Sequence, residues 1–207
     1  MRIKPRISTS VICVAIVSSA VALGGLATKC AETQLPGKRM IRVPSPDGHW
    51  VLISSPLMPS GDGTLSIEES KTGQHTVVKH FERSLGVGWS PDSKAYFLND
   101  QEGSNITEAY VYWPEKADPL RLDDLILKHD TEANAIRADH TYFRIRRWYN
   151  TQTLLVEYCG YSSESPTVQF DFFYRVYLTG SGHPEASIRR LSHKVGPIDL
   201  AINECSR

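Results

Sequence analysis

Two aspartates occupy the same position in two copies of a short motif, and a pair of carboxylates can carry out acid–base chemistry. They are Asp47 in Ser45-Pro46-Asp47-Gly48 and Asp92 in Ser90-Pro91-Asp92-Ser93, 45 residues apart. Two carboxylates at one site can divide the roles of acid and base. Each aspartate, however, follows a proline that presets φ, and an aspartate in this place bonds its own backbone, which is typical of a reverse turn. We therefore interpret both motifs as structural turns of a repeat.

The other residues of catalytic type form no pattern of known chemistry. Ser90 and Ser162 lack the glycine two positions later that a nucleophile elbow requires. The seven histidines include no His-Glu-x-x-His motif, and the glycine-rich pieces at 61–63 and 180–182 lack the lysine of a phosphate loop. The sequence therefore predicts no catalytic residue, no metal site and no cofactor.

A segment rich in arginine and aromatic residues indicates protein recognition instead. Arginine mixed with aromatic residues is the composition of interface hot spots. The candidate interface residues are Arg144, Arg146, Trp148, Tyr149 and Tyr161. The same segment also fits an outer β-strand whose core residues alternate with solvated arginines, and both interpretations stay open.

Residues 1–27 have the pattern of a secretory signal. Arg2, Lys4 and Arg6 precede an apolar stretch from Val11 to Leu23, and small residues follow. The stretch is shorter than the roughly 20 residues that span a bilayer, so a membrane role arises only if it is kept as an anchor. We expect export to the periplasm or the extracellular space. Without this segment the chain is mildly acidic, which argues against a nucleic-acid partner.

Three cysteines remain after removal of the signal, an odd number in a compartment that permits disulfides. We favour a bridge between Cys159 and Cys205, because both lie in sequence expected to fold. Cys30 lies in a polar lead-in, residues 28–38, that we expect to be flexible. A bridge between Cys30 and Cys205, or three free thiols, are the alternatives.

Strand patterns follow each motif and divide a single domain, residues 39–207, into three units at about 40–81, 85–122 and 142–193. The first two copy each other, since Asp47 to Leu65 and Asp92 to Tyr110 both span 18 residues. Alignment of Trp148 with Trp89 reveals the third unit. Its clearest strand places five residues on one face, namely Phe170, Phe172, Tyr174, Val176 and Leu178.

An insertion before the third unit has a helical pattern. Trp89 to Trp148 spans 59 residues, which exceeds the 45-residue period, and the excess lies at 123–140. Apolar residues recur there at spacings of three and four. Asp130 is placed to end one short helix and to cap a second.

The segment Trp89-Ser90-Pro91-Asp92-Ser93, followed by Ala95-Tyr96-Phe97-Leu98, resembles the repeat of TolB-type β-propellers. The segment from Val43 to Ile53 resembles it as well. The resemblance implies blade-like, four-stranded repeats and a role as an extracytoplasmic platform for binding, or as a noncatalytic domain attached to a hydrolase. Closed propellers have roughly four to eight blades, so three units predict an open stack, a sandwich or a ring completed by self-association.

The sequence thus predicts a mainly antiparallel all-β protein of three blade-like repeats with one helical insertion. We expect it to act in the bacterial periplasm or cell envelope by binding a protein partner, with an immunity-type inhibitor as one specific form. The loops 55–63, 99–107 and 160–167 are expected to present the binding rim. A small-ligand-binding protein or enzyme with a site assembled across the repeats is the alternative, and a structural envelope component is a third.

Overall fold

A computed structural model describes residues 32–58, 61–116, 118–179 and 185–197. The predicted signal at 1–27, Cys30 and Cys205 lie outside these residues. Within the described ranges, no helix combines the length and the hydropathy that a bilayer crossing needs.

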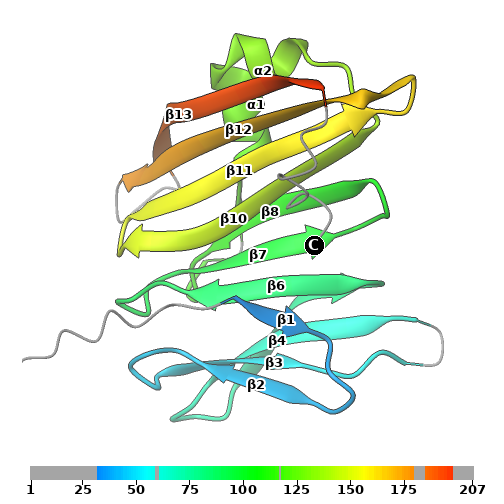
Figure 1. Cartoon of the computed structure of the whole chain (residues 1–207). Helices are drawn as coiled ribbons and strands as arrows, with labels where there is room; N and C mark the ends of the chain where they lie inside the picture. Colours follow the sequence, from blue (N-terminus) through cyan, green and yellow to red (C-terminus); the bar gives the residue numbers. More distant parts are fainter. Residues whose placement is uncertain (1–31, 59–60, 117, 180–184, 198–207) are drawn as a thin grey trace, which may run out of the picture.

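The first repeat is a separate antiparallel sheet of four strands (Figure 1). Its strands, in spatial and chain order, are β2 (Ile41–Pro44), β3 (Trp50–Ser54), β4 (Gly63–Glu69) and β5 (His75–Phe81). The side chains of Leu52, Leu65 and Ile67 alternate with more exposed ones and point to the core. The four strands lie where the sequence pattern predicts them.

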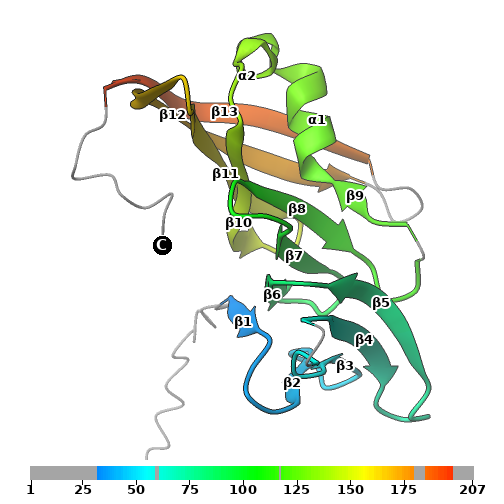
Figure 2. The same ribbon diagram turned by 90° about the vertical axis from the view of Figure 1, so that its right-hand side faces the viewer.

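The second and third repeats form one larger sheet. Its strands are β1 (Thr33–Leu35), β6 (Ser84–Trp89), β7 (Tyr96–Gln101), β8 (Ile106–Tyr112), β9 (Leu120–Arg121), β10 (His140–Asn150), β11 (Thr153–Ser162), β12 (Ser165–Thr179) and β13 (Glu185–Pro197). The described strands form two open sheets that do not close into a ring (Figure 2). An open arrangement is one of the outcomes that three repeats predict.

Two features of this sheet differ from the sequence prediction. The second repeat does not end as an independent blade, because β10 pairs in parallel with β8 at Ile106 and Thr107. That edge of β8 is open because β9 has only two residues and pairs further along the strand. The lead-in is also not wholly flexible, since β1 pairs antiparallel with β6 and covers an edge that would otherwise be exposed.

The helical insertion confirms the predicted break at Asp130. Helix α1 (Leu122–His129) ends there, and helix α2 (Thr131–Ala135) begins there. The Asp130 carboxylate accepts hydrogen bonds from the backbone N–H groups of Glu132 and Ala133, both at 3.1 Å, as an N-cap does. The buried residues Leu122, Ile126 and Ala133 pack into the core of the third repeat.

The first two turns are built by the same bonds. The hydroxyl of Ser45 donates to Asp47 Oδ1 at 2.6 Å, and that of Ser90 donates to Asp92 Oδ1 at 2.8 Å. Each hydroxyl also accepts a bond of 3.0 Å from the backbone N–H five residues later. The fourth residues share positive φ, 72° at Gly48 and 64° at Ser93. Both aspartates are therefore turn formers.

Tryptophan side chains join the repeats. The indole N–H of Trp89 donates to the carbonyl of Val43 at 3.0 Å, and that of Trp148 donates to the carbonyl of Gly88 at 3.3 Å. Val43 and Gly88 each stand two residues before the serine of their turn. The two bonds are thus equivalent, which supports the alignment of Trp148 with Trp89.

The middle repeat is buried on both faces. On one side, Val87, Trp89 and Leu98 belong to a core shared with the first repeat. On the other, Phe97 and Val111 belong to a core shared with the third repeat and the helices. Successive repeats therefore pack face against face, as propeller blades do.

Ser93 offers a test of how the turns are joined, because its hydroxyl accepts a bond of 3.0 Å from the backbone N–H of Asp47. Ser93→Ala removes this bond and keeps the strained φ, so we expect the free energy of unfolding to fall by about 1 kcal/mol. Ser93→Gly also removes the bond but relieves a strain of about 1 kcal/mol, so its stability should stay near wild type. Urea denaturation of the mature chain measures both. An alanine variant at least as stable as the glycine variant contradicts this account.

Candidate interaction surface on the third repeat

Strand alternation gives the third repeat two unlike faces. The inner face packs on the middle repeat and the helices, and it holds the predicted row from Phe170 to Val176 on β12, in which every second side chain is buried. Trp148 also points to this core, where it is 7% exposed. It is therefore a core residue and not part of an exposed interface.

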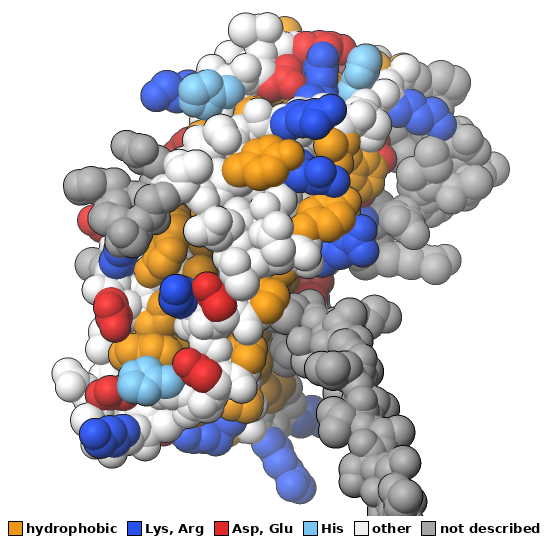
Figure 3. All heavy atoms as spheres, turned by 90° about the vertical axis from the view of Figure 1, so that its left-hand side faces the viewer, with side chains coloured by type: hydrophobic (Ala, Val, Ile, Leu, Met, Phe, Trp, Pro, Cys, Tyr) orange, Lys and Arg blue, Asp and Glu red, His pale blue; other side chains and the backbone are white. Residues whose placement is uncertain are grey.

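The outer face carries arginines that strand register brings together. Arg147 on β10 pairs with Leu155 on β11, Leu155 pairs with Arg175 on β12, and Arg175 pairs with Arg189 on β13. Paired residues on neighbouring strands lie on the same face, about 5 Å apart. We call Arg147, Arg175 and Arg189 the arginine row. In Figure 3, Lys and Arg side chains gather around exposed hydrophobic ones in the upper part of the view, where the third repeat lies.

The equivalent rows of the other repeats contain no charged residue. Each row begins at the residue whose carbonyl accepts an indole bond and continues through the residues paired with it on the neighbouring strands. In the middle repeat this row is Gly88, Phe97, Val111 and Leu120. That of the first repeat is Val43, Leu52, Ile67 and Thr76. Both rows face the repeat that follows them in the stack. The third repeat has arginines at the position where a following blade would pack.

Tyr149 lies between two members of the row. The guanidinium carbons of Arg147 and Arg175 each lie 4.6 Å from the centre of its ring, and the side chain is 41% exposed. Hydrogen bonds from Arg147 and then Arg175 to the phenol lower the pKa of Tyr149. Bonds to Tyr149 and Tyr177 in turn raise the pKa of the Arg175 guanidinium. The aromatic ring thus holds two like charges side by side.

The neighbouring arginines differ in how they are paired. Arg146 binds the carboxylate of Glu157, with its Nη2 at 3.0 Å from Oε1 and 2.8 Å from Oε2. Arg144 lies over the ring of Tyr142, and burial followed by the charge of Arg146 lowers its pKa. None of the three arginines in the row makes a salt bridge with a described residue.

This arrangement combines opposing contributions to stability, since the bonds to Tyr149 and Tyr177 favour the charged form of Arg175. Like charges directly opposite each other on neighbouring strands are destabilising, and Arg175 and Arg189 are such a pair.

Tyr161, the fifth predicted interface residue, lies toward the other end of the strand. Its ring stacks on that of His140 with centroids 4.2 Å apart. His140 also contacts the Ser163 hydroxyl at 3.1 Å, and the Asn105 amide donates to the carbonyl of Asp139 at 2.9 Å. These contacts bring together two of the three predicted rim loops, 99–107 and 160–167. The third, 55–63, lies in part outside the described residues.

Cys159 is a buried residue of β11, on the strand register that pairs it with Tyr142 and Asp171. Its predicted partner Cys205 lies outside the described residues, so the pairing stays a prediction. Within the described part of the chain, no group of three or more His, Cys, Asp or Glu residues is arranged to hold a metal ion.

Comparison with known proteins adds little to this geometry. No protein-family model matches the chain, and no curated protein matches it significantly. One solved structure, from a structural and mechanistic analysis of two prolyl endopeptidases, aligns with a TM-score of 0.44 and 19% sequence identity. The match covers 79% of this chain and 22% of that chain. At this TM-score the likeness carries no conclusion about activity.

Tyr149 provides a direct test of the row. Because the two guanidinium groups favour the phenolate, we expect one tyrosine to ionise below the ordinary range, while burial raises the pKa of Tyr158 to about 12. An absorbance titration near 295 nm should lose this early step in Tyr149→Phe. The step should move to higher pH in Arg175→Gln. An unchanged titration in both variants contradicts the contact of Tyr149 with the two arginines.

Proposed function

We propose that this protein is an exported, noncatalytic binding protein of the bacterial periplasm or cell envelope, and that its arginine row binds an acidic surface of a protein partner. The observation that carries the proposal is the register from β10 to β13, which places in one row three arginines that pair with no carboxylate among the described residues.

The chemistry of the row favours carboxylates. Guanidinium groups form bidentate, charge-assisted hydrogen bonds with carboxylates. The ring of Tyr149 holds the guanidinium group of Arg175 in place. Arginine and tyrosine are also the residues that dominate interface energetics. A partner that brings Asp or Glu opposite the row would relieve the repulsion between the arginines.

The position of the row favours a macromolecular partner. It lies on a sheet face that no described element covers, where a following blade would pack, and it spans the four strands from β10 to β13. Arg147, Tyr149 and Arg189 are exposed there. A small inhibitor of the immunity type, which blocks another protein by covering it, is one specific form of this function. Export rests on residues 1–27, as predicted from the sequence.

Capture of the partner tests the proposal. The tagged mature chain, residues 28–207, is crosslinked in envelope extract, and bound proteins are identified by mass spectrometry. We expect a stoichiometric protein partner that the triple variant Arg147→Gln, Arg175→Gln, Arg189→Gln no longer captures. A matched control changes Arg39 and Arg83, which are exposed near the first repeat, and should capture as wild type does. Equal capture by both variants contradicts the assigned surface.

Arg189→Gln separates a functional role from a structural one. Removing one of two opposed charges should raise the free energy of unfolding by about 0.2 to 1 kcal/mol, because cross-strand pairs have this size. The same change should weaken the captured complex by about fivefold, the equivalent of about 1 kcal/mol. Denaturation and titration calorimetry measure the two effects. A variant that loses stability and keeps full affinity shows that the row serves the fold alone.

A further inference from the structure

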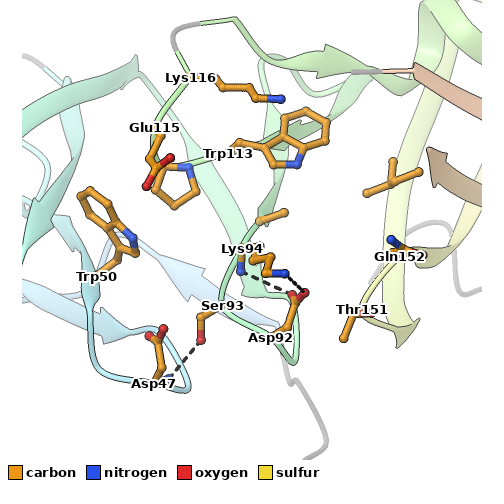
Figure 4. Close-up of a pocket in the computed structure, with 13 residues that line it drawn as sticks. Asp47, Trp50, Asp92, Ser93, Lys94, Trp113, Glu115, Lys116, Thr151 and Gln152 are labelled. Atoms are coloured by element: carbon orange, nitrogen blue, oxygen red, sulfur yellow. Dashed lines mark hydrogen bonds and ion pairs between the residues drawn. The ribbon is translucent and has the colours of Figure 1, made fainter. Parts of the chain in front are cut away.

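A pocket lies where the turns of all three repeats meet. Its volume is about 650 Å³, within the range of roughly 300 to 1,000 Å³ that small-molecule sites have. The first repeat contributes Asp47 and Trp50, the second Asp92 to Ala95 and the segment 113–116, and the third Thr151, Gln152 and Leu178. Figure 4 shows these side chains around the pocket.

The repeat explains why the space is open. Trp50 stands five residues after Ser45, and the same position of the second turn holds Ala95, which has only a methyl group. Trp113 forms another wall, so two indole rings border the space that the small residue leaves (Figure 4). Both rings are half-buried, which leaves part of each available for contact.

The charges around the two rings differ. The ammonium group of Lys116 lies 5.1 Å from the centre of the Trp113 ring, so this ring already has a cation. Lys94 reaches the Asp92 carboxylate, with Nζ 3.9 Å from Oδ2. Among the described residues, no lysine or arginine stacks on Trp50.

Two carboxylates accompany Trp50. Glu115 lines the pocket together with Trp50, and Asp47 belongs to the turn that precedes Trp50 (Figure 4). Neither makes a salt bridge with a described residue. Hydrogen bonds from Ser45 and then from the His49 backbone lower the pKa of Asp47, which keeps this carboxylate charged in mildly acidic solution.

We propose that this pocket binds a guanidinium or ammonium group carried on an aliphatic stem, with the cation on Trp50 between Asp47 and Glu115. An indole face attracts such cations, and the attraction grows when they are desolvated. The stem would lie along Ala95 and the Trp113 wall. The contact between Lys116 and Trp113 is an internal example of the same recognition. This ligand has the opposite charge to the one expected at the arginine row, so the two sites are tested independently.

The test uses the mature chain and a matched pair of probes, capped arginine amide and capped citrulline amide, which differ in charge and not in shape. Trp89 and Trp148 are 4% and 7% exposed, so ligand-induced changes in tryptophan fluorescence report mainly on Trp50 and Trp113. The indole N–H signals of the four tryptophans in a ¹⁵N spectrum provide a second readout. We expect saturable binding of the arginine probe, with the citrulline probe about fivefold weaker, the equivalent of about 1 kcal/mol for a cation–aromatic contact at an exposed site.

Substitutions in the pocket lining test where the ligand binds. Glu115→Gln should weaken the arginine probe by about tenfold, and Trp50→Leu should abolish its binding. Glu164→Gln is the matched control, since Glu164 is an exposed carboxylate in the β11–β12 turn, outside the pocket lining. Circular dichroism confirms that each variant folds. Equal affinity for the two probes, no response of the indole signals, or wild-type binding by Glu115→Gln overturns the proposal.

Two sources carry this chemistry, a basic side chain of a protein and a free amine. A peptide with one arginine in a glycine and serine frame, compared with spermidine, distinguishes them. Tighter binding of the peptide assigns a protein segment, and tighter binding of spermidine assigns a free polyamine. The triple glutamine variant of the arginine row should bind both probes as wild type does, so failure here and failure of the proposed protein partner remain separate results.

Discussion

The hydrogen bond from an indole N–H to the carbonyl of the preceding repeat is the interaction on which this stack depends. Trp89 makes it to Val43, and Trp148 makes it to Gly88. The first sheet has no strand paired with the second, so the Trp89 bond, the bond between Asp47 and Ser93 and the packing of side chains set how the first two repeats face each other. The second and third repeats are also joined by the pairing of β8 with β10. Once that orientation is fixed, Phe97 and Val111 face the third repeat, and the row of Arg147 faces outward.

The same constraint explains why the third repeat differs from the others. A blade inside a stack needs apolar residues on both faces, and the middle repeat has them. A terminal blade is released from this need on its outer face, and there Gly88, Phe97, Val111 and Leu120 are replaced by Arg147, Leu155, Arg175 and Arg189. The opposed pair of Arg175 and Arg189 adds a like-charge repulsion that the apolar row of the middle repeat does not have.

Much of the fold could be predicted from the sequence, because its signals are local. The turns of Asp47 and Asp92 come from short motifs, and the break at Asp130 comes from a capping residue. The pairing of β8 with β10 could not be predicted, because it depends on an edge left open by the shortness of β9. Of the predicted interface residues, Tyr149 lies at the arginine row, whereas Arg146 pairs with Glu157 and Arg144 lies over Tyr142. Arg175 and Arg189 are distant in sequence and join Arg147 only through register. Trp148 fits the composition of an interface, yet its indole is needed for the link to Gly88.

Chemical modification of arginine, read by mass spectrometry, tests the central claim most directly. The mature chain is treated with a dicarbonyl reagent that modifies guanidinium groups, alone and in complex with its captured partner. The account predicts that Arg147 and Arg189 react in the free chain and are protected in the complex, while the exposed Arg39 and Arg83 react equally in both. Unchanged reactivity of Arg147 and Arg189 in a saturated complex would contradict it, because the partner would then lie elsewhere on the stack.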